Sequence, residues 1–239
     1  MKKNIVFINN QNPSPGSQYS INSWDFWCKK NNCELFVLEN KLYDDQSFNK
    51  FSVFELLENS NIEYNQILIP NTDTIINPSS PNIFNITDNK LCGVFYNSSY
   101  NWLLRSIENY SKYIFDGFMF PYWEYLDTGM IIVNQKHKEF FKNVLDFYLH
   151  NQENISQMSQ TFDVGTDQPI FNFLKHINDI DFKVLPYEWN MQDMIRKEVI
   201  SDLVFTNIGW IYQFNFLSSH KNQLMQNTYK KLYEKKNKK

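Results

Sequence analysis

The chain has 239 residues, which is enough for one sizeable hydrophobic core or two small ones. Its apolar and aromatic content is that of a folded globular protein, and a formal net charge of −3 gives no overall basic signal for nucleic acid. No apolar run reaches the roughly 18 residues that a membrane helix needs. The short apolar run Ile5–Ile8 predicts a first strand rather than a signal peptide.

The cysteines Cys28, Cys33 and Cys92 have no metal-binding spacing and are odd in number. We therefore expect free thiols in a reducing compartment. Asparagine and lysine are very frequent, which is typical of an AT-rich genome such as that of a virus or a streamlined bacterium. The expected location is cytoplasmic, in the host cytoplasm if the source is viral.

Short apolar runs and amphipathic stretches alternate along the first half of the chain. Strands are predicted at Ile5–Ile8, Leu35–Leu38 and Ile67–Ile69, with a helix between the first two. A second helix leads into the third strand, and its inward face is formed by Phe48, Phe51, Phe54 and Leu57. This order of strands and helices predicts an α/β protein with a parallel sheet.

A polar turn follows the third predicted strand. Pro70 cannot donate a hydrogen bond to a sheet ladder, so the strand is predicted to end there. Asn71, Thr72 and Asp73 then place two oxygen-bearing side chains, one residue apart, at the carboxyl end of a buried strand. In open α/β sheets ligands bind in the crevice outside these strand ends. Side-chain oxygens, completed by phosphates and water, hold Mg²⁺ or Mn²⁺ on a nucleotide in this way.

The alternation continues beyond this turn. Leu91–Phe95 and Leu126–Asn134 predict strands, and the helix between them carries Arg105. The guanidinium fork of Arg105 suits phosphate oxygens, unless the side chain is a solvated surface group. His137–Leu149 predicts an amphipathic helix, and polar Asn151–Gln160 predicts a loop or a frayed helix.

The last third of the chain contains shorter elements. Thr166 is a good helix N-cap, with Pro169 tolerated in the first turn. Short strands are predicted at Val204–Phe205 and Ile211–Tyr212. An amphipathic helix begins near Asn222 and ends in a lysine-rich run, which is either a solvated tail or a contact for a phosphate-rich partner.

Two of these segments resemble blocks of known glycosyltransferases. ILIPNTDTIINPSSPNIF resembles the D-x-D segment of GT-A glycosyltransferases, with Asp73 at the second acid and Asn71 where the first acid is usual. LDTGMIIVN resembles the F-N-S/T-G-V-M-L-I-N strand of glycogenin-like, family-eight transferases, with Asp127 where that family has Asn. The resemblance implies that Gly129 leaves room for the donor sugar. The alternative is a structural bulge.

Three later segments extend the resemblance. TDQPIFN resembles the family's D-Q-D-I-L-N block, which places Asp167 and Gln168 beside the acceptor and the donor sugar. Asp167 also suits the first turn of a helix. The L-P…W-N pattern includes Trp189, and His220 resembles the late histidine that closes the metal site in many GT-A enzymes. The alternative for His220 is an ordinary surface residue.

The resemblance implies a GT-A (Rossmann-like) α/β fold with a mixed, mainly parallel sheet flanked by helices. Residues 1–221 would form a single catalytic domain, and residues 222–239 a C-terminal helix with a lysine-rich tail. The implied nucleotide-binding residues are Ile8, Asn9, Asn10, Asn71, Thr72 and Asp73. The implied sugar-binding residues are Arg105, Thr128, Gly129 and Trp189. The implied ligands of Mn²⁺ or Mg²⁺ are Asn71, Asp73 and His220, and the implied catalytic residues are Asp127, Asp167 and Gln168.

The resemblance implies transfer of a sugar from a nucleotide-diphosphate sugar, UDP-linked, to a hydroxyl of a glycan or small-molecule acceptor, with retention favoured. If the reaction inverts, Asp167 is the expected base. One alternative is a viral glycosyltransferase acting on a modified DNA base, which the lysine-rich tail motivates. Another is a non-catalytic nucleotide-sugar-binding domain, because Asn71 replaces an acid. No membrane span is expected.

Overall fold

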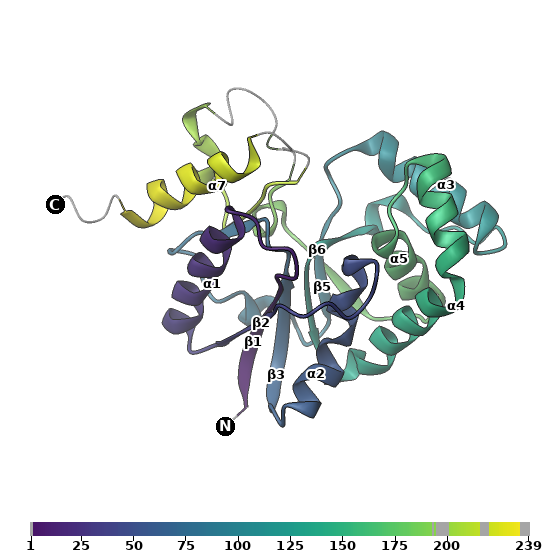
Figure 1. The fold of residues 1–239 in the computed structure, drawn as a ribbon, viewed down its shortest axis with the longest axis horizontal. Coiled ribbons are helices and arrows are strands. Elements are labelled where there is room, and N and C mark those ends of the chain that lie inside the picture. The colour runs from purple at the N-terminus through teal and green to yellow at the C-terminus, as the bar shows by residue number, and fades with distance from the viewer. Residues whose placement is uncertain (1, 193, 195–200, 216–219, 235–239) are drawn as a thin grey trace.

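The structure is a computed structural model that describes residues 2–192, 194, 201–215 and 220–234 (Figure 1). Its centre is a six-stranded sheet, within these residues, of order β2-β1-β3-β6-β5-β7. The strands are β1 Lys3–Asn9, β2 Glu34–Leu38, β3 Tyr64–Pro70, β5 Leu91–Phe95, β6 Leu126–Asn134 and β7 Phe182–Leu185. Strand β6 runs antiparallel to both neighbours, and the remaining pairs are parallel. The predicted α/β class with a mixed, mainly parallel sheet is confirmed.

Helices flank the sheet, and short 3₁₀ turns link them to the strands. The helices are α1 Ser17–Asn31, α2 Val53–Asn59, α3 Tyr100–Tyr113, α4 Lys138–Phe162, α5 Asp167–Ile177 and α7 Lys221–Tyr229. The 3₁₀ turns are η1 Gln46–Ser52, η2 Ile83–Ile86, η3 Tyr122–Glu124, η4 Gln135–His137, η5 Tyr187–Trp189 and η6 Val204–Asn207, and a π-helical turn, η7 Lys230–Glu234, follows α7.

Both faces of the sheet are buried because side chains alternate along each strand. On one face Val6 and Ile8 of β1 pack with Trp24 of α1. On the other face Ile5 and Phe7 join a larger cluster that includes side chains of η1, α2, α3, α4 and α5. Figure 1 shows α1 on one side of the sheet and α3, α4 and α5 on the other. The strand runs are accordingly apolar throughout, as expected for a sheet covered on both sides.

The C-terminal part of the chain folds back over the carboxyl end of β3. Strand β4, Thr74–Ile76, pairs antiparallel with β8, Ile211–Gln213. Helix α7 packs beside α1, and the Gly16 amide donates a hydrogen bond of 3.0 Å to Asn222 Oδ1. This packing brings the first residues of α7 to the polar turn between β3 and β4.

One predicted strand is absent from the structure, and one prediction that left two alternatives open is decided by it. Val204–Phe205 lies in a 3₁₀ turn rather than a strand, and the left-handed backbone of Leu203 (φ 51°) precedes it. Residues 151–160, predicted as a loop or a frayed helix, continue α4 with one distorted residue, Asn151, so the helical alternative holds. Buried Ile155 and Met158 hold this otherwise polar segment against the core. Tertiary contacts therefore replaced the missing amphipathic pattern.

Three further predictions concern the cysteines, membrane-spanning helices and the C-terminal tail. Cys28, Cys33 and Cys92 are free thiols, and all of them are buried. Across the described ranges, no helix is both long enough and apolar enough to cross a membrane. The end of the lysine-rich tail, residues 235–239, lies outside the described residues.

Candidate functional site

A polar cavity of about 360 Å³ opens at the edge of the sheet where β1 and β3 end and β6 begins. Since β6 is antiparallel, its first residues reach the same edge as the last residues of β1 and β3. The strand residues of the lining are Asn9, Ile69, Pro70, Asp127, Thr128, Gly129 and Gln213. The lining is completed by Gln46, Ser47, Lys50, Asn71, Thr72, Tyr96, Trp102, Gly165, Asp167, Gln168 and Asn215.

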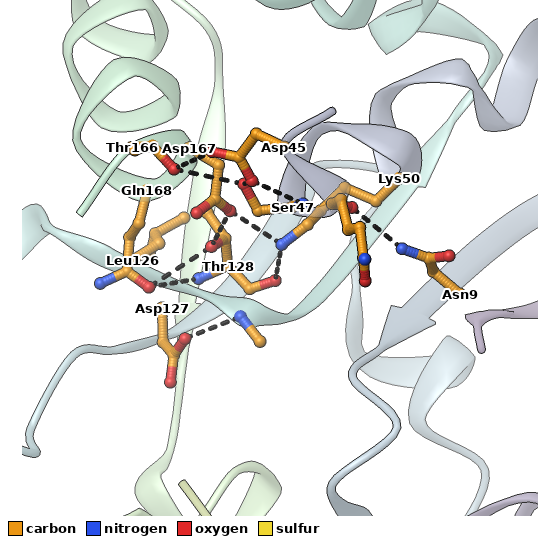
Figure 2. A network of polar contacts seen from close by, with 12 residues as sticks. Asn9, Asp45, Ser47, Lys50, Leu126, Asp127, Thr128, Thr166, Asp167 and Gln168 are labelled. Carbon is orange, nitrogen blue, oxygen red and sulfur yellow. Dashed lines mark hydrogen bonds and ion pairs between the residues drawn. The ribbon is translucent and has the colours of Figure 1, made fainter. Parts of the chain in front are cut away.

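The wall of the cavity contains an ion pair between Lys50 of η1 and Asp167 of α5 (Figure 2). Lys50 Nζ lies 2.9 Å from Asp167 Oδ2 and donates to the Thr128 carbonyl at 3.1 Å. The Thr128 hydroxyl donates to the same Asp167 oxygen at 2.8 Å, and its amide donates to Gln168 Oε1 at 3.0 Å. These contacts tie η1, β6 and the first turn of α5 into one polar unit.

A second group of hydrogen bonds joins the start of α5 to the residues before η1. Thr166 Oγ1 donates to Asp45 Oδ2 at 2.6 Å, and Ser47 Oγ donates to Asp45 Oδ1 at 2.6 Å (Figure 2). Thr166 does occupy the N-cap position of α5, but its side chain makes no capping hydrogen bond. The hydroxyl that the sequence assigns to the helix end instead fixes η1, and with it Lys50, against α5.

Asp127 is the buried acid of the cavity, with only 3% of its surface exposed. Burial raises the pKa of Asp127 from 3.8 to about 7, although the Gly129 amide and Lys50 favour the ionised form. The charges of Asp73 and Asp167 add to the increase in pKa. Asp127 Oδ1 accepts from the Gly129 amide at 2.7 Å. Asp127 is therefore able to gain or lose a proton near neutral pH.

Gly129 has no side chain because Gln213 occupies that space. A Cβ at Gly129 would lie 2.3 Å from Gln213 Nε2 and 2.8 Å from Gln213 Oε1. The Gln213 amide is held in place by Asn190, whose Nδ2 donates to Gln213 Oε1 at 2.9 Å. Asn190 Nδ2 also lies 3.3 Å from Asp127 Oδ2, so Gln213 and Asp127 share one orienting partner. The close approach predicted for a sugar at Gly129 is made here by a side chain of β8.

The polar turn after β3 divides between the cavity and helix α7. Asn71 and Thr72 line the cavity. Asp73 is not among the lining residues, and its Oδ2 forms an ion pair with Lys221 Nζ at 2.8 Å. Asp73 Oδ1 is buried and has no hydrogen-bond partner among the described residues. The turn is anchored through the Asp73 carbonyl, which accepts from the Phe214 amide at 2.8 Å.

Three solved structures that are similar to this chain are glycosyltransferases. The chain is similar to a glycosyltransferase involved in the glycosylation of the major capsid of PBCV-1, at a TM-score of 0.65 and 10% identity, over 94% of this chain and 99% of that chain. It is also similar to the WbbM bifunctional glycosyltransferase (TM-score 0.56, 11% identity, 99% of this chain and 50% of that one). A third is the glycosyltransferase GlyE of Streptococcus pneumoniae TIGR4 (TM-score 0.51, 10% identity, 99% and 64%).

The chain has a glycosyltransferase fold. It spans half of WbbM and about two thirds of GlyE, whereas it spans nearly all of the capsid glycosyltransferase. No protein-family model matches the sequence, and no curated protein matches it either. At 10–11% identity the likeness concerns the fold, and the chemistry of the site has to be argued from this chain's own residues.

The glycosyltransferase fold raises the question of a divalent ion at the turn of Asn71 and Asp73. Such an ion takes about six oxygen ligands and favours charged ones. Asn71 is neutral, and one oxygen of Asp73 is taken by the Lys221 ammonium. The described residues contain no group of three or more His, Cys, Asp or Glu side chains arranged to hold a metal ion. These donors do not fit a resident divalent ion.

The remaining predicted site residues do not line the cavity. Ile8 and Trp189 are buried in the apolar cluster on the α1 face. Asn10 is buried, and its backbone N–H donates to the Leu38 carbonyl at 2.8 Å. Arg105 donates to the Asp163 carboxylate and carbonyl, both at 2.9 Å, outside the cavity lining. His220 is exposed at the N-cap position of α7, next to Lys221.

Sequence patterns did not reveal several residues of the site. Lys50 lies between the inward-facing Phe48 and Phe51. The aromatic pattern of that segment predicts neither that Lys50 is buried nor that it pairs with Asp167, 117 positions away. Lys221 lies 148 positions from its partner Asp73, and Gln213 lies 23 positions from its partner Asn190. The one available signal is Asp45, which stands just before the aromatic stripe as a helix-starting acid does. Contacts of this sequence separation come from the fold alone.

Proposed function

We propose that this chain is a glycosyltransferase that moves a sugar from a nucleotide-diphosphate sugar, UDP-linked, to an acceptor hydroxyl. The observation that carries the proposal is the meeting of Asp127, Thr128, Asp167 and Gln168 in one polar cavity at the carboxyl edge of the sheet. Ligands of open α/β sheets bind at this edge. The glycosyltransferase fold supports the same conclusion.

The reaction breaks the bond between the anomeric carbon and a diphosphate oxygen, and that oxygen keeps the electron pair. The acceptor oxygen forms the new bond to the anomeric carbon and loses its proton. Asp127 is our assigned proton acceptor because it lines the cavity and its pKa is raised to about 7 by burial. This assignment replaces the expectation that Asp167 is the base, since Lys50 and Thr128 both contact the same Asp167 oxygen.

Asp167 and Gln168 would instead position the sugar and the acceptor. Both sit in the first turn of α5, and contacts to Lys50 and Thr128 restrict their side chains. A rigid polar wall of this kind holds hydroxyls in an attacking geometry at little entropic cost during the reaction. The resemblance to glycogenin-like transferases implies retention, which needs attack from the face that the diphosphate leaves, whereas direct displacement from the opposite face with Asp127 as the base inverts the anomeric configuration. The anomeric signal of the product in NMR distinguishes the two.

The experiment is a hydrolysis and transfer screen with a panel of nucleotide sugars. We expect one donor to be consumed, and Asp127→Asn to reduce the rate by at least ~100-fold, the size of a lost general base. The matched control is Asp181→Asn, which removes an exposed acid paired with Lys90. Equal rates for wild type and Asp127→Asn, with Asp181→Asn also unchanged, would remove Asp127 from the mechanism.

A second candidate is a domain that binds a nucleotide sugar without transferring it. The Asp73–Lys221 pair favours this candidate, because it engages the acid that the family resemblance assigns to metal binding. Binding of a donor with no hydrolysis and no transfer to any acceptor would support it. The viral origin and the modified-DNA-base acceptor rest on composition and on the lysine-rich tail. Both stay predictions. DNA binding that weakens as salt is added, and that weakens when the tail is deleted, would support them.

A further inference from the structure

Three large aromatic side chains are exposed at the edge of the sheet that holds the cavity. Trp123 is 60% exposed, Tyr100 is 58% exposed and Tyr122 is 39% exposed. Tyr100 begins α3 shortly after β5 ends, and the other two lie in η3 just before β6 begins. Because β6 runs antiparallel to β5, the end of β5 and the start of β6 meet at one edge of the sheet. We call Tyr100, Tyr122 and Trp123 the aromatic platform.

The rings of the aromatic platform contact one another and adjoin the cavity. The centroid of the Tyr122 ring lies 5.5 Å from that of Tyr100 and 5.3 Å from that of Trp123. Tyr96 and Trp102 line the cavity, and their ring centroids are 4.9 Å apart. Tyr100 and Trp102 share the first turn of α3, which spans only ~5 Å along the helix axis. The platform therefore begins at the rim of the cavity.

The backbone beneath the platform is fixed by α5, the helix that also carries Asp167 and Gln168. Lys175 is fully buried, and its Nζ donates to the Glu124 carbonyl of η3 at 2.7 Å. Asn172 is also fully buried and bonds both backbone groups of Leu126. Its Oδ1 accepts from the Leu126 amide and its Nδ2 donates to the Leu126 carbonyl, each at 2.8 Å. The exposed rings therefore stand on a turn that is held in register with the catalytic strand.

The chemistry of the platform favours a sugar as its ligand. Single exposed apolar side chains are ordinary, whereas a contiguous group of them marks a binding surface. Tyrosine and tryptophan combine a flat apolar face with a polar edge, which suits a sugar ring that has C–H groups on its face and hydroxyls around it. Residues 95–104 and 118–125 contain no Lys, Arg or His, and Glu124 is their one acid. A polyanion such as DNA would find no countercharge in these two segments.

We propose that the aromatic platform binds one sugar unit of the acceptor, so that the acceptor is a neutral oligosaccharide rather than a single sugar or a DNA base. This inference rests on the proposed glycosyltransferase function. The unit that carries the attacking hydroxyl enters the cavity, and a neighbouring unit stacks on the platform. No bond forms or breaks at the platform. Its contribution is to bind the acceptor and to restrict its orientation toward the donor.

The first test is binding of the full chain to a printed array of neutral glycans, followed by calorimetry with the glycan that binds most strongly. Trp123→Ala should weaken this binding about tenfold and Tyr100→Ala about fivefold, whereas Trp123→Phe keeps most of it. The matched control is Tyr113→Ala, which should bind like wild type. Tyr113 is 51% exposed, stacks on one other ring, that of Phe162, and lies at the far end of α3, ~20 Å along the axis.

The second test separates the acceptor from the donor. Hydrolysis of the nucleotide sugar by water needs no acceptor, so Trp123→Ala and Tyr100→Ala should hydrolyse the donor at the wild-type rate. In transfer to the same glycan, both variants should raise the KM for the acceptor and leave kcat nearly unchanged, because the platform binds without taking part in bond breaking. Oligothymidylate, as a probe for DNA, should bind wild type and both variants equally.

A third measurement needs no variant, so a substitution that fails to fold does not prevent the test. Hydroxyl-radical labelling of the wild type, read by mass spectrometry, should show Trp123 and Tyr100 protected when the glycan is added and Tyr113 unprotected. Labelling that is the same with and without the glycan would contradict the proposal.

The remaining outcomes separate this inference from the proposed function. A wild type that consumes a donor but binds no neutral glycan, or variants that bind the glycan as tightly as wild type, overturns the platform and leaves the transferase. Glycan binding at the platform with no donor consumed removes the transfer and keeps the glycan site. Oligothymidylate binding that Trp123→Ala abolishes assigns the surface to nucleic acid, and a dimer that Trp123→Ala dissociates assigns it to a second copy of the chain. Either result overturns the proposal.

Discussion

Asp127→Asn should change how the stability of the protein depends on pH. The folded state holds the pKa of Asp127 at about 7, mainly because the carboxylate is buried, whereas the unfolded chain gives it the ordinary value of 3.8. Between these two values the folded state binds the extra proton, so the free energy of unfolding falls as the pH rises. The stability supported by this group is complete at low pH and is lost as the pH passes through 7.

The size of the effect follows from the two pKa values. Each pH unit between them is worth ~1.4 kcal/mol, so the wild type should lose about 2 kcal/mol relative to Asp127→Asn between pH 5 and pH 7. The relative loss should flatten above pH 8. Asparagine has nearly the same shape and keeps an oxygen for the Gly129 amide, and the comparison across pH cancels any constant cost of the substitution.

The assay is urea unfolding of both proteins at half-unit steps from pH 5 to pH 8.5, followed by fluorescence. The quantity compared is the difference between the two free energies of unfolding at each pH, which removes contributions from other titrating groups. A difference that stays constant within ~0.5 kcal/mol over this range would show that Asp127 is ionised throughout, and the buried-acid reasoning would be wrong.

Two further substitutions test other parts of the site, and a pH titration tests a buried histidine outside it. Lys50→Met removes the cation from a largely buried pair and should lower the free energy of unfolding by about 3 kcal/mol, measured by urea unfolding. Adding Asp167→Asn should recover part of that loss, and no recovery would argue against the pair. Gly129→Ala forces the Gln213 side chain aside and should cost about 2 kcal/mol in the same assay, with recovery in combination with Gln213→Ala. His137, whose pKa burial lowers to about 4, should make the folded state lose ~1.4 kcal/mol per unit as the pH falls from 6.5 towards 4, and an NMR titration that gives an ordinary pKa would refute this.

The sequence predicted the class of fold because periodicity is a local property. The apolar run Ile67–Ile69 and the amphipathic pattern of His137–Leu149 needed no distant residue to be interpreted. The prediction stayed open where a local pattern was weak, as in residues 151–160 of α4, which buried side chains hold in a helix. Val204–Phe205 failed in another way, since an apolar pair of that length fits a strand and a 3₁₀ turn equally well.

The sequence likewise predicted some features of the candidate site and missed others. Asp127, Thr128, Gly129, Asp167 and Gln168 were named from short motifs, and all of them line the cavity. Motifs of this kind identify residues whose neighbours in the chain carry information about them. They give no information on the partners, which determine whether an acid is ionised, paired or exposed.

By itself, then, the sequence determined the alternation of strands and helices, the buried apolar faces and the polar residues at the strand ends, since each depends on neighbours within about one turn or one strand. Only the tertiary structure decided that Asp167 meets Lys50, that Gln213 fills the space above Gly129, and that Asp73 is held by Lys221. The physical reason is that charge and close contact depend on distance in space. Chain folding sets that distance for residues as far apart as Asp73 and Lys221.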